Sequence, residues 1–147
     1  MQISYQNQFK DKGHKCEALI IRCMDFRFHK ALGENIGQII GSENCSYDSP
    51  GVGGGGSKSI IDEESRKVVF SAIDIAKEIH HIKKIIIADH IDCGAYDGSS
   101  KFENKEREKE FHIEKLNQAG NIIAEHYPNL DLVLVYQDWE TIEIINK

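Results

Sequence analysis

Two cysteines and one histidine stand in two short clusters that could together hold a metal ion. Cys23 opens the run Cys-Met-Asp-Phe-Arg, and His90 and Cys93 belong to the run His-Ile-Asp-Cys-Gly. Two thiolates and one imidazole bind zinc tetrahedrally and leave its fourth position free, which distinguishes a catalytic zinc from a structural one. The three residues are therefore predicted to hold one catalytic zinc ion per chain.

Each cluster directly follows a run of aliphatic residues that is predicted to be a buried strand. The first run covers residues 17–22 and the second covers 85–88. Short continuous aliphatic runs are typical of strands in parallel sheets that are covered on both faces. In open α/β sheets, ligands bind beyond the carboxyl ends of strands, where neighbouring strands send their connections to opposite faces. If these two strands are neighbours, the three side chains meet at that edge.

The remaining pattern alternates strands with helices. Further strands are expected at 44–48, 132–136 and 141–145, and helices are expected at 64–81 and 104–126. The second helix is expected to bury the apolar stripe Phe111, Ile113, Leu116, Ile122 and Ile123. This order predicts a single α/β domain over residues 16–147, with a mostly parallel central sheet flanked by helices. Residues 1–15 are predicted to be an N-terminal arm.

Composition excludes several classes of partner. The 147 residues carry 18 basic and 24 acidic side chains, a net charge of −6, so we expect no nucleic-acid partner, which would need a concentrated basic surface. No apolar run approaches the ~18 residues of a membrane span, and the polar start lacks a signal core, so no membrane partner is expected. We expect a cytoplasmic location with reduced thiols. Cys16 and Cys45 lack the combination of an aliphatic strand end and a His-x-x-Cys partner, and they are assigned to packing or the surface.

Asp25 and Arg27 follow the first cysteine and could control the free zinc position. A free aspartate beside the metal would be attracted to it and could close the site. The planar guanidinium of Arg27 can hold a carboxylate through two parallel hydrogen bonds and keep it off the ion. Asp25 could then orient a zinc-bound water or hydroxide. The alternative is an ordinary surface ion pair worth ~0–1 kcal/mol.

The pattern Cys-x-Asp-x-Arg after the first strand, followed by His-x-x-Cys-Gly after a later one, resembles the β-class carbonic anhydrases. The resemblance implies that Cys23, His90 and Cys93 are zinc ligands and that Asp25 and Arg27 form the catalytic dyad. It also implies reversible hydration of carbon dioxide to bicarbonate by a zinc-bound hydroxide, in a homodimer or higher homo-oligomer.

The chain departs from that family pattern in its shorter N-terminal region and at two further places. The family usually has glycine directly before the histidine, where this chain has Asp89. The family's Arg-Asn-Ala-Gly-Asn type of loop is replaced by Ser-Pro-Gly-Val-Gly-Gly at 49–54. Backbone amides at Gly53, Gly54 and Gly94 are the candidates for holding a substrate oxygen.

Three other functions fit parts of the sequence. A non-catalytic zinc-binding module, or a sibling hydrolase acting on carbonyl sulfide or carbon disulfide, would use the same ligands. A phosphate-binding NTPase is suggested by the glycine tract that ends at Gly56. That motif requires lysine directly after the last glycine and a helix that starts there, whereas Ser57 intervenes and the helix is expected later.

Supporting groups around the site are less specific in the sequence. His29 and His112 are candidate proton shuttles because histidine titrates near neutrality, although exposed surface histidines are the simpler interpretation. Tyr96 and Asp92 are candidates for orienting the ligands.

Overall fold

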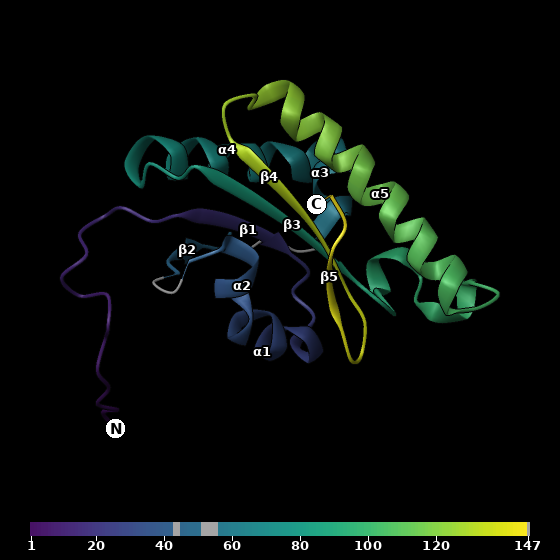
Figure 1. The fold of residues 1–147 in the computed structure, drawn as a ribbon, viewed down its shortest axis with the longest axis horizontal. Coiled ribbons are helices and arrows are strands. Elements are labelled where there is room, and N and C mark those ends of the chain that lie inside the picture. Colours follow the sequence, from purple (N-terminus) through teal and green to yellow (C-terminus); the bar gives the residue numbers. More distant parts are fainter. Residues whose placement is uncertain (43–44, 51–55, 147) are drawn as a thin grey trace.

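One five-stranded sheet forms the centre of the molecule (Figure 1). The computed structural model describes residues 1–42, 45–50 and 56–146. The strands are β1 (Ala18–Arg22), β2 (Tyr47–Asp48), β3 (Lys84–His90), β4 (Asp131–Gln137) and β5 (Ile142–Ile144). Their order across the sheet is β2-β1-β3-β4-β5, and only β5 runs antiparallel to its neighbour. The predicted α/β class with a mostly parallel sheet is confirmed.

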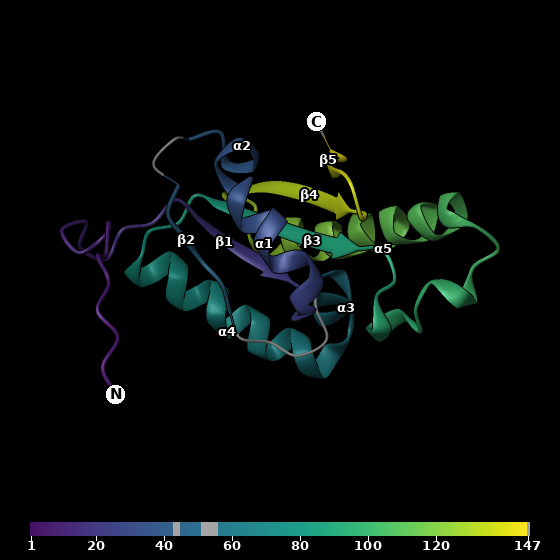
Figure 2. The same cartoon turned by 90° about the horizontal axis from the view of Figure 1, so that it is seen from below.

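Helices cover both faces of the sheet. They are α1 (Phe26–Glu34), α2 (Ile36–Ile40), α3 (Gly56–Ile61), α4 (Glu63–Ile79) and α5 (Lys105–His126), with short 3-10 turns η1 (Gly94–Tyr96) and η2 (Ser99–Lys101). Figures 1 and 2 show α1 and α2 on one face and α3, α4 and α5 on the other. The core is accordingly divided into two apolar clusters, one on each side of the sheet.

The connections place a switch point between β1 and β3. The chain leaves β1 through α1 and α2 on one face, whereas it leaves β3 through α5 on the opposite face. The two strands are parallel neighbours, with Arg22 paired to Ala88 at their carboxyl ends. A crevice for ligands forms where adjacent strands diverge in this way. The prediction that these two strands are neighbours is therefore confirmed.

Side-chain caps explain where the longer helices begin. Asp25 accepts a hydrogen bond from the Arg27 amide (3.0 Å) at the start of α1. Asp62 accepts from the Ser65 amide (3.0 Å) at the start of α4, and Asn104 does the same for α5. Each cap satisfies an amide that has no partner within its own helix. The residue that caps α1 is thus also a predicted site residue.

Two boundaries differ from the sequence prediction. Strand β3 continues to His90, so the histidine is the last residue of the strand and does not follow it. Helix α3 already begins at Gly56, so the expectation that the helix starts well after the glycine tract is wrong. The Asp89 carboxylate accepts a hydrogen bond from the Ser57 amide (2.7 Å) at this helix start. A negative side chain thus lies where a phosphate loop would bind its anion, which disfavours the NTPase alternative.

The core face of α5 is more polar than predicted. Its buried residues are Glu108, His112, Leu116, Ala119, Gly120 and Ile123, whereas Phe111, Ile113 and Ile122 are only half-buried. The predicted stripe is therefore partly wrong. The cause is that two polar residues face the sheet, which hides the apolar periodicity on which the prediction rested.

Residues 1–15 form no helix or strand, and all of them are exposed. Figures 1 and 2 show their trace extending from the start of β1 away from the sheet. Their role as an arm separate from the domain stays a prediction. Among the described residues, no helix combines the length and apolarity that a membrane crossing requires.

Replacing Gly56 with alanine is expected to lower the free energy of unfolding by about 3 kcal/mol. Gly56 has a φ of +25°, and a Cβ there would overlap Asp89 Oδ1 and the Ala88 carbonyl oxygen. Gly94→Ala is the matched control, since a Cβ at Gly94 meets no atom within 4 Å. Urea denaturation measures both variants. Equal urea midpoints for Gly56→Ala and Gly94→Ala would show that α3 does not need this close approach to β3.

Candidate metal centre

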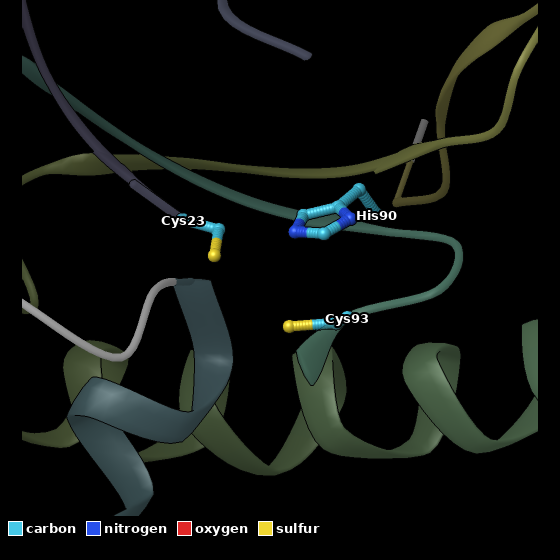
Figure 3. A group of neighbouring side chains, drawn as sticks. All are labelled: Cys23, His90 and Cys93. Atoms are coloured by element: carbon cyan, nitrogen blue, oxygen red, sulfur yellow. The ribbon is translucent and has the colours of Figure 1, made fainter. Parts of the chain in front are cut away.

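Cys23, His90 and Cys93 converge at the carboxyl ends of β1 and β3 (Figure 3). Cys23 is the first residue after β1, His90 ends β3, and Cys93 follows after a two-residue turn. One ligand atom from each residue lies within 4.8 Å of the other two. Atoms bound to one zinc ion at ~2.0–2.3 Å are about 3.3 to 3.8 Å apart in tetrahedral geometry. The cluster therefore fits a single ion after small side-chain adjustments.

The His90 ring is oriented for ligation through Nε2. Its Nδ1 lies 2.7 Å from the Ile91 carbonyl oxygen and donates a hydrogen bond to it, which leaves the lone pair on Nε2. Nε2 is buried and forms no hydrogen bond with any described residue. A buried nitrogen without a partner is costly, and a metal ion would satisfy it. The Phe28 ring stacks on the imidazole at 4.2 Å and restrains its orientation.

Arg27 joins the two sequence clusters. Its Nε and Nη2 donate to the Asp25 carboxylate at 2.9 and 2.6 Å, and its Nη1 donates to Asp92 Oδ2 at 2.9 Å. No Asp25 oxygen belongs to the group of ligand atoms. The guanidinium also lies 5.6 Å from the ring centroid of Phe28 and 5.2 Å from that of Trp139. The carboxylate is therefore held beside the cluster and does not enter it.

Comparison with known proteins decides the family. Residues 13–145 match the family described as "Putative carbonic anhydrase". The chain belongs to this carbonic anhydrase family. It is 33% identical over 123 residues to an uncharacterized protein of Rickettsia bellii, which covers 80% of this chain and 73% of that one. It is 30% identical over 135 residues to the uncharacterized protein RC0076 of Rickettsia conorii, which covers 88% of this chain and 72% of that one.

Solved carbonic anhydrases share the fold of this family member. A β-carbonic anhydrase from Sordaria macrospora, one of two described as tetrameric, superposes with a TM-score of 0.54 over 92% of this chain and 83% of its own, at 15% identity. β-Carbonic anhydrase isoform I of Trichomonas vaginalis gives 0.54 over 98% and 87%, at 16% identity. At these identities the likeness establishes the fold alone, and the β-carbonic anhydrase-like architecture is confirmed.

Electrostatics in this carbonic anhydrase-family site favour a cation between the sulfurs. Hydrogen bonding with the Cys93 thiol lowers the pKa of Cys23 to about 4, although burial acts in the opposite direction. The same interaction, together with burial, raises the pKa of Cys93. Burial lowers the pKa of His90, but attraction to the Cys23 sulfur and the Ile91 carbonyl outweighs it and raises the pKa overall. A divalent ion would relieve the repulsion between two thiolates.

The Asp25 carboxylate is ionised at neutral pH. The hydrogen bonds from Arg27 lower the pKa of Asp25 to about 2. The Ser99 amide and Arg27 lower the pKa of Asp92 as well. Arg27 therefore lies between two carboxylates that both stay negative, which holds its position.

A buried glutamate fixes the turn that carries Cys93. Glu108 on α5 is 1% exposed, and it accepts hydrogen bonds from the Asp92 amide (2.6 Å) and the Ser99 hydroxyl (2.7 Å). Asp92 has a φ of +56°, so the turn is tight at this point. Asp92 thus acts on the site through Arg27 and the turn, and it makes no contact with the ligand atoms that the structure records.

Asp89 holds the ligand strand to two helices. Its carboxylate accepts from the Ser57 amide and hydroxyl at 2.7 and 2.5 Å, and the His112 ring lies 3.1 Å away. The Tyr96 hydroxyl in turn lies 2.8 Å from the Ser57 hydroxyl. The sequence singled out Asp89 as unusual and Tyr96 as a supporting group, but it missed Ser57. An acid in an otherwise aliphatic strand was the only signal that a polar partner must exist.

The two candidate shuttles are not surface histidines. His112 is fully buried against Asp89, and His29 is half-buried with its Nε2 3.1 Å from the Cys23 carbonyl oxygen. The surface interpretation is therefore wrong for His112, because Asp89 supplies a buried partner. Gly53 and Gly54 lie outside the described residues. Gly94 is exposed at the start of η1 beside Cys93.

Proposed function

We propose that this chain catalyses the reversible hydration of carbon dioxide to bicarbonate with one zinc ion held by Cys23, His90 and Cys93. The observation that carries the proposal is the combination of three converging ligand atoms with a carboxylate restrained beside them. A structural zinc would need a fourth protein ligand. The salt bridges of Arg27 with Asp25 and Asp92 hold the Asp25 carboxylate beside the ligand atoms, which would leave the fourth zinc position free.

The chain's own residues would supply orientation and charge. Zinc, when bound, would lower the pKa of water to about 7 and so provide a nucleophile near neutral pH. The Asp25 carboxylate would accept a hydrogen bond from that nucleophile. The oxygen lone pair of the nucleophile would then be directed toward carbon dioxide. Arg27 would balance the negative charge of the site, and the amide of Gly94 is a candidate donor to a substrate oxygen.

Stopped-flow hydration of carbon dioxide from pH 6 to 9 tests the proposal. We expect turnover that rises with pH, because the attacking species must lose a proton. Asp25, whose pKa is about 2, stays ionised across this range, so the profile reports a different group. Zinc-loaded protein without activity at any pH would contradict the proposal and favour a non-catalytic module or a hydrolase for related molecules.

We also propose that the chain works in the cytoplasm as a homo-oligomer. The Sordaria macrospora enzymes of the same fold are described as tetrameric. Strand β5 is an edge strand, and the neighbouring Trp139 is 50% exposed although it also packs on Phe28. Exposed sheet edges are commonly covered by another chain.

A further inference from the structure

A second group of metal-binding side chains lies at the opposite end of the sheet. Cys16 precedes β1, Asp48 ends β2, and His80 caps the carboxyl end of α4. The fold brings them together because β2 pairs with β1, and because the Cys16 amide donates to the His80 carbonyl at 3.1 Å. Figure 1 shows the start of β1 and the end of α4 at the same end of the molecule, away from the carboxyl ends of β1 and β3.

We propose that Cys16, Asp48 and His80 form a second metal site, which binds a transition-metal ion of the zinc class. One ligand atom from each residue lies within 4.8 Å of the other two. His80 Nδ1 is 2.5 Å from Asp48 Oδ2, so a bound ion would replace this hydrogen bond with two coordinate bonds. The spacing matches the about 3.3 to 3.8 Å of tetrahedral zinc ligands after small rotations.

The ligand types select the class of ion. One thiol, one carboxylate and one imidazole suit zinc, cobalt and similar ions, whereas calcium and magnesium require sites made of oxygen atoms. A thiolate and a carboxylate together carry two negative charges, which equal the charge of a divalent cation. A bound divalent ion would therefore leave the three ligands and the ion neutral in total once the thiol has lost its proton.

Burial and the negative charge of Asp48 raise the pKa of Cys16 to about 11. A divalent ion would reverse the effect of that charge, because it lies closer to the sulfur than the carboxylate does. Metal binding and loss of the thiol proton are thus coupled at this site.

The site is open to solvent and has room for a further ligand. Asp48 and His80 side chains are 29% and 30% exposed, and they line a groove of about 500 Å³ between the N-terminal segment and the sheet edge. The His14 ring stacks on the His80 ring with 6.1 Å between centroids. His14 is not among the converging ligand atoms, and it would complete the coordination after a movement of the N-terminal segment. A bound ion would then tie residues 1–15 to the sheet.

Cobalt(II) titration of metal-free protein in a Cys23→Ser/Cys93→Ser background tests the site. Those two substitutions remove both thiolates of the first centre, so any thiolate-to-cobalt charge-transfer band must come from Cys16 or Cys45. We expect one equivalent of bound cobalt with a band of single-thiolate intensity. Adding Cys16→Ser should abolish the band, whereas adding Cys45→Ser should leave it unchanged. Cys45 is the matched control because it lines the same groove but directs its sulfur toward α2.

A folded background protein that binds no cobalt would overturn the proposal and leave only a hydrogen bond between His80 and Asp48. If the background variant does not fold, zinc content of otherwise unmodified protein replaces it as the test. We expect two equivalents per chain, falling to one in His80→Gln and staying at two in His81→Gln. Carbon dioxide hydration by His80→Gln should be unchanged, so failure of the second site is distinguishable from failure of the proposed function.

Discussion

Replacing Cys93 with serine is expected to remove one equivalent of zinc per chain and to lower kcat/KM for carbon dioxide hydration roughly 1,000-fold or more. Serine keeps its hydroxyl proton at neutral pH and is a poor zinc ligand, whereas thiolates are among the preferred ones. Losing even the partners that merely orient metal ligands typically costs 10–100-fold, so losing a ligand should cost more. Elemental analysis and stopped-flow hydration measure the two effects together.

Cys45→Ser is the control for this substitution. It makes the same chemical change at a half-buried thiol outside both groups of metal-binding residues. Full zinc content in Cys93→Ser would contradict the ligand assignment. Loss of zinc with undiminished turnover would instead contradict the proposed function while leaving the site intact.

Replacing Asp25 with asparagine is expected to lower kcat/KM about 100-fold or more while zinc content stays unchanged. A positioned acid–base or orienting group typically contributes 10²–10⁴-fold, and asparagine is a neutral acceptor with one oxygen, which the Arg27 amide already occupies. The substitution should barely affect folding, because asparagine caps helices about as well as aspartate. The amide of Arg27 therefore keeps its partner at the start of α1.

Asp92→Asn separates the role of Asp25 from the general effect of weakening Arg27. Both aspartates bind the guanidinium, but the charge of Asp25 also acts on His90. Asparagine tolerates the positive φ at this position. We expect a loss well under 10-fold for this control. Equal losses in the two variants, or wild-type activity in Asp25→Asn, would remove Asp25 from the mechanism.

The metal centre was predictable because its signals are local. Each ligand lies at or just after the end of an aliphatic run, and parallel strands covered on both faces have such runs. The strand that contains Ile85 was recognised from this pattern, and its pairing with β1 was the condition on which the predicted convergence depended. The confirmed neighbours β1 and β3 then required Cys23, His90 and Cys93 to meet.

Polar groups in the core were not predictable from spacing. Glu108 and His112 face the sheet, where an apolar stripe was expected, because their partners come from distant segments. Asp92 and Ser99 satisfy the glutamate, and Asp89 satisfies the histidine. A buried polar side chain is acceptable only with such partners, and a sequence pattern does not reveal partners that are remote along the chain.

The same limitation hid the second group of metal-binding residues. Cys16 was assigned to packing or the surface because it does not follow an aliphatic strand as the ligands of the first centre do. Its neighbours in space come from residues 48 and 80, which only the pairing of β2 with β1 and the end of α4 bring close.

Helices α1 and α2 were also absent from the sequence prediction. Asp25, which caps the start of α1, was assigned to the metal site and was not recognised as the beginning of a helix.

The contacts of Asp89 have an evolutionary consequence. Glycine at this position in a relative would remove the acceptor for the Ser57 amide and hydroxyl and leave the enclosed ring of His112 without its anion. A substitution at only one of these positions would then leave buried hydrogen-bond donors without acceptors, at a cost of about 1–3 kcal/mol for each group. Positions 57, 89 and 112 should therefore be inherited as a set, so that lineages diverge at all three together.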